Sequence, residues 1–283
     1  MAGEDWKRQL STRPHIRAGR FVEAAAIVAV SLFWTCAPAF AESKLNARDI
    51  ARRLFQLAPG ERIDLGGRDL RQLDLSGLDF RRARMAGSDL FGTDLGRSDL
   101  SGTDLHGARL DRAVIIGADF SGADLSGATL LLPTAVSSLA YDASEAPRFR
   151  NAKLARARIV AHLSGADFSG ADLTAAVFNH ADMRGTLMTA LRTELFGCDL
   201  TRAILRSTDL TGIRLRFAKM RQADLTGAVL VNVDLSKADL TGADLTGADI
   251  AGVDFDGAVL VGTKGLETVK GLALARNLDK AVR

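Results

Sequence analysis

A large apolar residue returns at every fifth position over long stretches of this chain, and this spacing restricts the fold more than any other feature. One stretch runs without a slip from Leu65 to Leu130 and a second from Leu195 to Leu260, with fourteen such residues in each. Neither the 3.6-residue period of an α-helix nor the two-residue period of a strand keeps every fifth residue on one side. The spacing therefore predicts a chain that turns a corner every five residues.

The other positions of the five-residue unit are also regular. The residue two before each large apolar centre is usually small, as at Ala118 and Ala223, and the residue just before it is usually Asp, as at Asp119. We expect the large and the small residue to point inward, so that stacked coils bury a continuous column and pair their backbones as a parallel sheet does. Seven further centres bring the total to thirty-five: Leu154, Ile159, Phe168, Leu173, Phe178, Met183 and Met188.

The runs ADFSGADLSG at residues 118–127 and ADLTGADLTG at residues 238–247 resemble the pentapeptide-repeat proteins. The resemblance extends over residues 61–262. It implies an all-β solenoid, a right-handed quadrilateral parallel β-helix in which four repeats make one coil. Thirty-five repeats then correspond to about nine coils, with residues twenty apart stacked on one another.

The segments at both ends of the repeat are expected to form short helical caps. Residues 42–60 predict an N-terminal capping helix, with Asn46 as its N-cap and Ile50 on its apolar side. Residues 263–283 predict a C-terminal helical cap, which Gly271 divides into one or two short helices. In the family that this chain resembles, the C-terminal end often serves as a cap or a dimer contact, so a homodimer through it is one option.

The β-helix is expected to be interrupted by a loop at residues 131–151. A regular solenoid has no interior room for an insertion of this length, so the loop must leave the coil. Exposed loops on rigid scaffolds often carry recognition. Tyr141, Arg148 and Arg150 are therefore candidate partner-binding residues. The alternative is a tolerated insertion that has no function.

The first 41 residues have the order of a secretion signal. Basic residues up to Arg20 precede an apolar run at residues 24–34, and a small-x-small sequence ends at Ala41. We expect residues 1–41 to be a signal peptide cleaved after Ala41, which touches the membrane only transiently and leaves a periplasmic or secreted protein. The alternative is an uncleaved N-terminal membrane anchor. Both tryptophans, Trp6 and Trp34, would be removed by cleavage.

The sequence offers little chemistry for catalysis. The many Asp residues repeat in one outward position, which indicates a solvated, turn-stabilising role. His106, His162 and His180 do not have the spacing of metal ligands. Cys198 takes the inward position that Ala fills elsewhere, so a buried and unreactive thiol is expected. We therefore predict no enzyme activity, no cofactor, no metal site and no small-molecule substrate.

Charge argues against nucleic acid as a partner. The formal net charge is +3 for the whole chain and about +1 without the first 41 residues. A nearly neutral protein has no overall field that gathers a polyanion. Basic residues nevertheless gather in one zone, which either docks an acidic partner or is a charge-balanced solvated surface. The candidates in this zone are Arg206, Arg214, Arg216 and Arg221.

These observations predict a non-catalytic exported scaffold or protein-binding rod of the cell envelope, with a protein partner that the sequence does not identify. The alternative, implied by the resemblance, is a DNA-mimicking protein that binds or protects a DNA topoisomerase. That role relies on a strongly negative surface and on residence in the cytoplasm. The nearly neutral charge and the export signal count against it.

Overall fold

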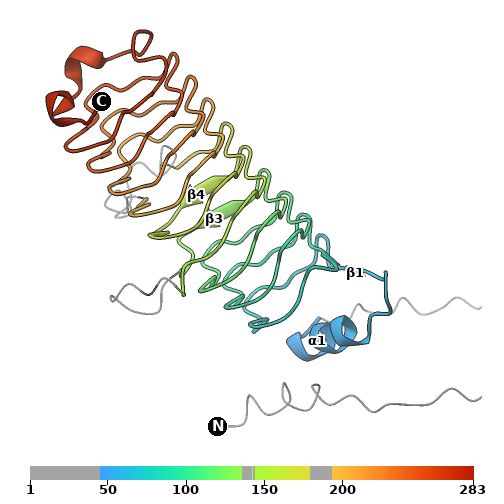
Figure 1. The fold of residues 1–283 in the computed structure, drawn as a ribbon. Coiled ribbons are helices and arrows are strands. Elements are labelled where there is room, and N and C mark those ends of the chain that lie inside the picture. Colours follow the sequence, from blue (N-terminus) through green and yellow to red (C-terminus); the bar gives the residue numbers. More distant parts are fainter. Residues whose placement is uncertain (1–44, 136–141, 143, 179–192) are drawn as a thin grey trace, which may run out of the picture. The chain divides into compact units, whose positions relative to one another are not determined.

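The computed structural model describes residues 45–135, 142, 144–178 and 193–283. All of them belong to one compact unit, Leu45–Arg283. Within this unit the chain winds as a right-handed quadrilateral β-helix, and successive coils pair in parallel along a common axis (Figure 1). The fold class implied by the resemblance to the pentapeptide-repeat proteins is confirmed.

Each regular coil has four sides of five residues, and the sides that stack on one another form four faces. We number the faces by the large apolar centres of the first coil. The first side of face 1 is centred on Leu65, that of face 2 on Leu70, that of face 3 on Leu75 and that of face 4 on Phe80. Parallel bridges join a side to the one twenty residues later, as between Asp69 and Asp89. Residues twenty apart therefore stack as predicted.

Two places on the faces are regular enough to form short strands. Strand β1 (Ile63–Asp64) pairs in parallel with β2 (Ala83–Arg84) on face 1. Strand β3 (Thr129–Leu131) pairs in parallel with β4 (Arg158–Val160) on face 2. The remaining sides are held by single bridges, because the chain turns before a longer ladder can form.

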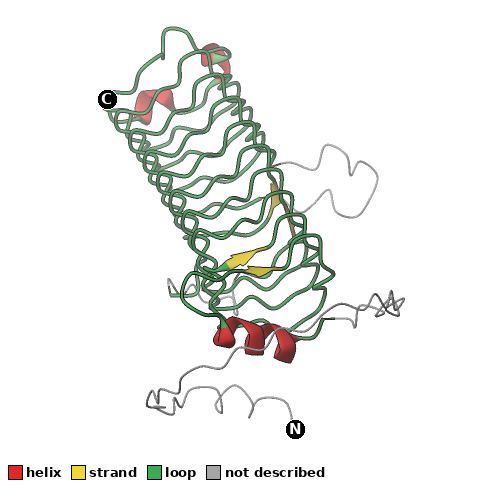
Figure 2. Ribbon diagram, turned by 90° about the vertical axis from the view of Figure 1, so that its right-hand side faces the viewer, coloured by secondary structure: helices red, strands yellow, loops and turns green. Residues whose placement is uncertain are grey.

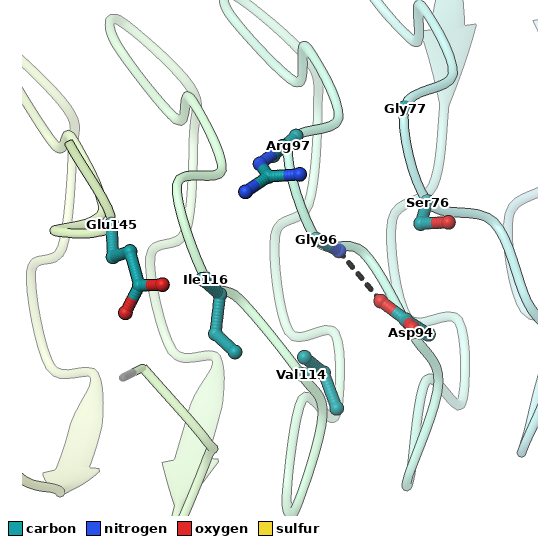
Figure 3. A pocket seen from close by; sticks show the side chains of 8 residues that line it. All are labelled: Ser76, Gly77, Asp94, Gly96, Arg97, Val114, Ile116 and Glu145. Atoms are coloured by element: carbon teal, nitrogen blue, oxygen red, sulfur yellow. Dashed lines mark hydrogen bonds between the residues drawn. The ribbon is translucent and has the colours of Figure 1, made fainter. Parts of the chain in front are cut away.

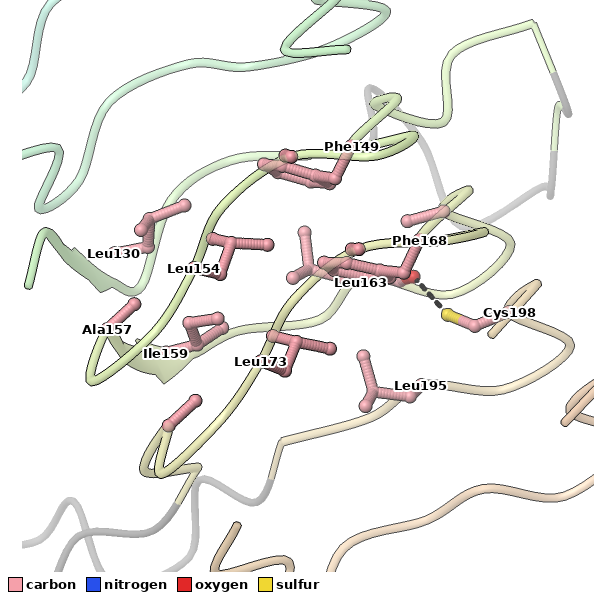
Figure 4. Close-up of a cluster of buried hydrophobic side chains, with 14 of the residues drawn as sticks. Leu130, Phe149, Leu154, Ala157, Ile159, Leu163, Phe168, Leu173, Leu195 and Cys198 are labelled. Atoms are coloured by element: carbon pink, nitrogen blue, oxygen red, sulfur yellow. Dashed lines mark hydrogen bonds between the residues drawn. The ribbon is translucent and has the colours of Figure 1, made fainter. Parts of the chain in front are cut away.

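The large apolar centres and their small companions fill one continuous core. Every predicted centre in the described ranges is buried, and Leu95 and Leu110 are completely so. The rings of Phe120, Phe149 and Phe168 stack on face 4, with centroid separations of 5.1 Å and 4.7 Å. Figure 4 shows Phe149 and Phe168 side by side among the aliphatic side chains. The stacked coils bury this single column, whereas a β-sandwich buries the space between two sheets.

The recurrent Asp has a specific task at the corners. At Asp244, for example, the Oδ1 atom accepts a hydrogen bond of 2.9 Å from the backbone N–H of Thr246, the first turn residue. The same bond of 2.9 Å joins Asp64 to Gly66 in the first coil. The hydrogen bonds from the Thr246 hydroxyl and amide hold the pKa of Asp244 below its usual range. The next turn residue, Gly247, has a φ of +66°, which glycine adopts without strain.

The first insertion is shorter than the range 131–151 given by the repeat pattern. Ala135 is buried as the centre of a side on face 3, and Phe149 is buried as the next centre on face 4. Across the insertion Asp119 bridges to Arg148, 29 residues later instead of twenty. The pattern missed these two sides because Ala135 is small and Phe149 follows at an irregular interval.

A second insertion falls between Phe178 and Thr193. Leu163 centres a side on face 3 only four residues after Ile159, and the bridge from His162 leads to Glu194, 32 residues later. Leu195 therefore follows Phe178 in the order of the coil. The predicted centres Met183 and Met188 lie outside the described residues.

The N-terminal end of the core is covered by helix α1 (Ala47–Gln56). The side chain of Asn46 accepts a hydrogen bond of 2.9 Å from the backbone N–H of Asp49, which makes Asn46 the N-cap. Ile50 and Leu54 are buried against the first coil. The apolar side of this helix thus seals the open end of the column.

The C-terminal segment carries two short 3₁₀ helices, η3 (Leu272–Leu274) and η4 (Leu278–Lys280), and it also completes a last coil (Figure 2). Its residues continue the bridges of the four faces, with Lys270 pairing to Asp249 and Arg276 to Asp254. The separation of the bridged residues rises from 20 to 23 around this coil, because three of its four sides are one residue longer. The final coil is therefore wider than those below it.

Candidate protein-binding face

The arginines singled out in the sequence do not gather on one face. Arg148 lies on face 4, Arg206 at the corner after face 1, and Arg214 on face 3. Arg150 and Arg221 lie at corners after face 4, and Arg216 lies at a corner after face 3. Arg214 and Arg216 line the same hollow. Tyr141 lies outside the described residues.

Each of these six arginines meets a carboxylate of a neighbouring coil. Two examples are the separations of 2.7 Å from Arg150 to Asp167 and 2.6 Å from Arg214 to Glu194. The other pairs are Arg148 with Asp119, Arg206 with Asp224, Arg216 with Asp234, and Arg221 with Asp239. Exposed pairs of this kind contribute little to stability, but they neutralise much of the basic zone.

Asp167 illustrates the balance at these pairs. Burial acts to raise the pKa of its carboxyl, and the hydrogen bonds from Ser169 and Arg150 outweigh it, so the pKa is lowered. The guanidinium of Arg150 is thereby partly satisfied within the chain. The predicted arginines are thus less available to a partner than their number suggests.

Two phenylalanines that the sequence analysis did not single out are exposed on adjacent coils. Phe196 is 48% exposed and Phe217 is 41% exposed. Their rings meet edge to face with centroids 5.2 Å apart. Both occupy turn positions after face 3, where the other described turns between regular coils carry small or polar residues except at Ile116. An aromatic residue at a turn position was the signal that could have identified them.

Cations surround this aromatic pair. The guanidinium of Arg216 lies 5.6 Å and the ammonium of Lys237 5.4 Å from the ring centre of Phe217. We call these four residues, Phe196, Arg216, Phe217 and Lys237, the aromatic corner. By contrast, Phe91 at another corner is only half-exposed and lies 4.6 Å from the guanidinium of Arg109.

Two hollows lie along face 3. One, of about 480 Å³, adjoins Phe196 and is lined by Ser164, Glu194, Arg214, Arg216 and Asp234. The other, of about 430 Å³, lies nearer the N-terminal end, where Val114 and Ile116 form an apolar wall beside Asp94, Arg97 and Glu145 (Figure 3). Glycines at successive corners leave the space for this second hollow.

Both insertions leave the coil at the edges of face 3. The first departs after Ala135, the centre of a face 3 side, and the second departs after Phe178 and returns at Thr193, where a face 3 side begins. Face 3 is therefore the face that combines the hollows, the aromatic corner and the flanking insertions. It is the strongest candidate for a binding surface.

The reactive groups among the described residues include one buried thiol and the histidines. In the described ranges no three His, Cys, Asp or Glu side chains are grouped so as to hold a metal ion. Burial raises the pKa of the Cys198 thiol to about 12, and its Sγ donates to the carbonyl oxygen of Leu163 at 2.9 Å. His162 lies 3.3 Å from Glu194 on the surface, and His180 falls outside the described residues. Among the described helices, none has the length and apolar character needed to span a bilayer.

Solved structures of several other proteins are similar to this chain. The solved structure of HetL, a pentapeptide repeat protein involved in heterocyst differentiation regulation from the cyanobacterium Nostoc sp. strain PCC 7120, is 28% identical, with 84% of this chain and 94% of HetL covered and a TM-score of 0.33. QnrB1, a plasmid-mediated fluoroquinolone resistance protein, is 17% identical over 76% of this chain and 90% of its own, with a TM-score of 0.33.

A pentapeptide repeat protein from the thylakoid lumen of Arabidopsis thaliana is 27% identical over 43% of this chain and 71% of its own, with a TM-score of 0.23. A search of curated proteins gave no match. The family model of pentapeptide repeats matches in eight copies, over residues 61–97, 93–130, 161–189, 193–230 and 223–262. These matches extend over more than half of the sequence, and the chain belongs to the pentapeptide repeat family.

Proposed function

We propose that this chain is a non-catalytic, exported scaffold that binds a protein partner through face 3. The observation that carries the proposal is the exposed pair Phe196 and Phe217, with a hollow of about 480 Å³ beside it. Exposed aromatic residues next to a concavity are typical anchors of protein interfaces. The rigid β-helix holds this surface in a fixed geometry without ordering it on binding.

Site-specific photo-crosslinking tests the proposal. A photoreactive phenylalanine analogue is placed at position 196 of the full-length chain in producing cells, and a matched copy carries it at Phe55, which is 54% exposed on α1. We expect a cross-linked protein partner from position 196 that is lost when Phe217→Ser is added, and none from position 55. No cross-link from position 196, or equal ones from both positions, would contradict the proposal.

The exported location rests on the sequence of residues 1–41. Cell fractionation of the full-length chain with a C-terminal tag should place the product outside the cytoplasm. Because Trp6 and Trp34 both precede Ala41, the purified product should lack tryptophan fluorescence if cleavage occurs. A tryptophan-containing product in the membrane fraction would indicate the retained anchor, and one in the cytoplasm would contradict export.

A second copy of the chain is a further candidate partner, at the C-terminal end. The last coil exposes Leu272, Leu274 and Val282, with Leu274 67% exposed. Exposed apolar residues at the open end of a solenoid favour docking of another end. Analytical ultracentrifugation should show a dimer that Leu274→Glu dissociates.

The DNA-mimicking alternative has less support from the charge pattern. Every face interrupts its acidic column with a cation: Arg84 on face 1, Arg109 on face 2, Arg214 on face 3 and Arg148 on face 4. A duplex-like surface needs continuous negative charge. Inhibition of DNA supercoiling by the purified chain would be the observation in its favour.

A further inference from the structure

The aromatic corner combines exposure with backbone strain. Phe217 has a φ of +59° at a turn position that glycine fills in many other coils. A bulky side chain in the left-handed region is strained relative to one in the right-handed region. The ring of Phe217 nevertheless remains 41% exposed, although it contacts Phe196, Arg216 and Lys237. The geometry therefore points to a contact outside the chain.

The charges beside the two rings define what that contact must carry. Glu194 is matched by Arg214 at 2.6 Å, while Arg216 lies 3.8 Å from Asp234. Lys237 has no carboxylate within 4.0 Å in the described part of the chain and lies over the Phe217 ring. The corner thus presents one uncommitted cation and one loosely paired cation next to apolar surface.

From these contacts we infer that the partner docks an acidic stretch of polypeptide that also carries an apolar side chain. A carboxylate would meet Lys237 and Arg216, and the apolar side chain would pack on the rings of Phe196 and Phe217. This inference rests on the proposed protein-binding function and names the chemistry of the segment that binds.

A nucleic-acid strand fits the same surface poorly. Its phosphates would follow the face into Glu194, Asp234 and Asp254, which stand on face 3 around the aromatic corner. Each of these carboxylates repels a phosphate, whereas a peptide can place one or two carboxylates only where the cations are. Arg216 and Lys237 can each meet a single carboxylate of a peptide, but the carboxylates beside them oppose a continuous polyanion.

Selection from a displayed library of random dodecapeptides tests the inference. The full-length chain in detergent is the bait, and the Phe196→Ser/Phe217→Ser variant removes peptides that bind elsewhere. We expect the remaining peptides to combine Asp or Glu with a Leu, Phe, Trp or Ile. A synthetic copy of the best peptide is then measured by fluorescence anisotropy.

Two charge-reversal variants test whether Lys237 contributes to binding of the peptide. Lys237→Glu should weaken binding of the synthetic peptide about tenfold, and a rise from 50 mM to 500 mM salt should weaken it by a similar factor. Lys153→Glu, on face 1, should leave the affinity within about twofold. Circular dichroism of each variant verifies that it is folded.

The outcomes separate this inference from the function on which it rests. The inference of an acidic partner segment is overturned if the selected peptides are basic or uncharged, or if none depends on the two phenylalanines. The cross-linking from position 196 tests the protein-binding function independently. A labelled dodecanucleotide that binds the full-length chain and is lost in Phe196→Ser/Phe217→Ser would also overturn it and identify nucleic acid instead.

Discussion

Replacing Gly271 by alanine tests whether the C-terminal segment forms a last coil. A coil and a free helical segment predict changes in stability of opposite sign. Gly271 has a φ of +73°, and a Cβ built on it would lie 2.6 Å from the backbone nitrogen of Ala251 in the coil below. Left-handed strain contributes roughly 1–2 kcal/mol and the overlap with fixed backbone roughly 1–3 kcal/mol, so destabilisation of roughly 2–5 kcal/mol is expected. In a free helical segment, alanine would instead stabilise by about 1 kcal/mol.

The matched control is Gly262→Ala, because Gly262 has a φ of +65° and no atom within 4 Å of its built Cβ. It carries the backbone strain alone. A terminal coil opens locally, so the measurement is amide hydrogen exchange of residues 264–282 in the full-length chain. We expect Gly271→Ala to accelerate exchange at least about fivefold more than Gly262→Ala. Equal acceleration, or slower exchange, would refute the coil.

Three further predictions concern the core and the corners. Phe149→Ala should destabilise the β-helix by roughly 3–5 kcal/mol, because it removes the middle ring of the face 4 stack; urea denaturation followed by circular dichroism measures this, and a loss under about 1 kcal/mol would contradict it. In a Cys36→Ser background, Cys198 should resist a thiol reagent at pH 8 and react in urea, since burial raises its pKa to about 12; labelling of the folded chain would be the opposing result. The lowered pKa of Asp244 and of other corner carboxylates means that their stabilisation is complete above about pH 4 and lost as pH falls through the folded pKa. The urea midpoint should therefore be similar at pH 7 and pH 5 and lower at pH 3; an unchanged midpoint at pH 3 would argue against this.

The repeat pattern was informative wherever one five-residue unit decides the structure by itself. A large residue at Leu95 and a small one two positions earlier turn inward because the next corner follows at once, and Asp94 closes that corner by accepting the N–H of Gly96 at 2.8 Å. The N-cap at Asn46 is equally local. Such features need no knowledge of the neighbouring coil.

The irregular parts of the β-helix were harder to predict from the sequence. Ala135 gave no large apolar signal and Phe149 follows at an irregular interval, so the true limits of the first insertion were not apparent. The candidate site was affected in the same way. The arginines were chosen by their density along the chain, whereas Phe196 and Phe217 meet only because their turns lie on successive coils.

The sequence by itself determined that the chain turns a corner every five residues, which residues line most of its column and that the recurrent Asp stabilises the turns, and its resemblance to the pentapeptide-repeat proteins implied the four sides. The tertiary structure decided which cations are neutralised, where the two insertions depart, and that Phe196 and Phe217 share one corner. The physical reason is that inward and outward orientation depends on five consecutive residues. Stacking depends on the full length of a coil, and each insertion changes that length by an amount that the repeat pattern does not reveal.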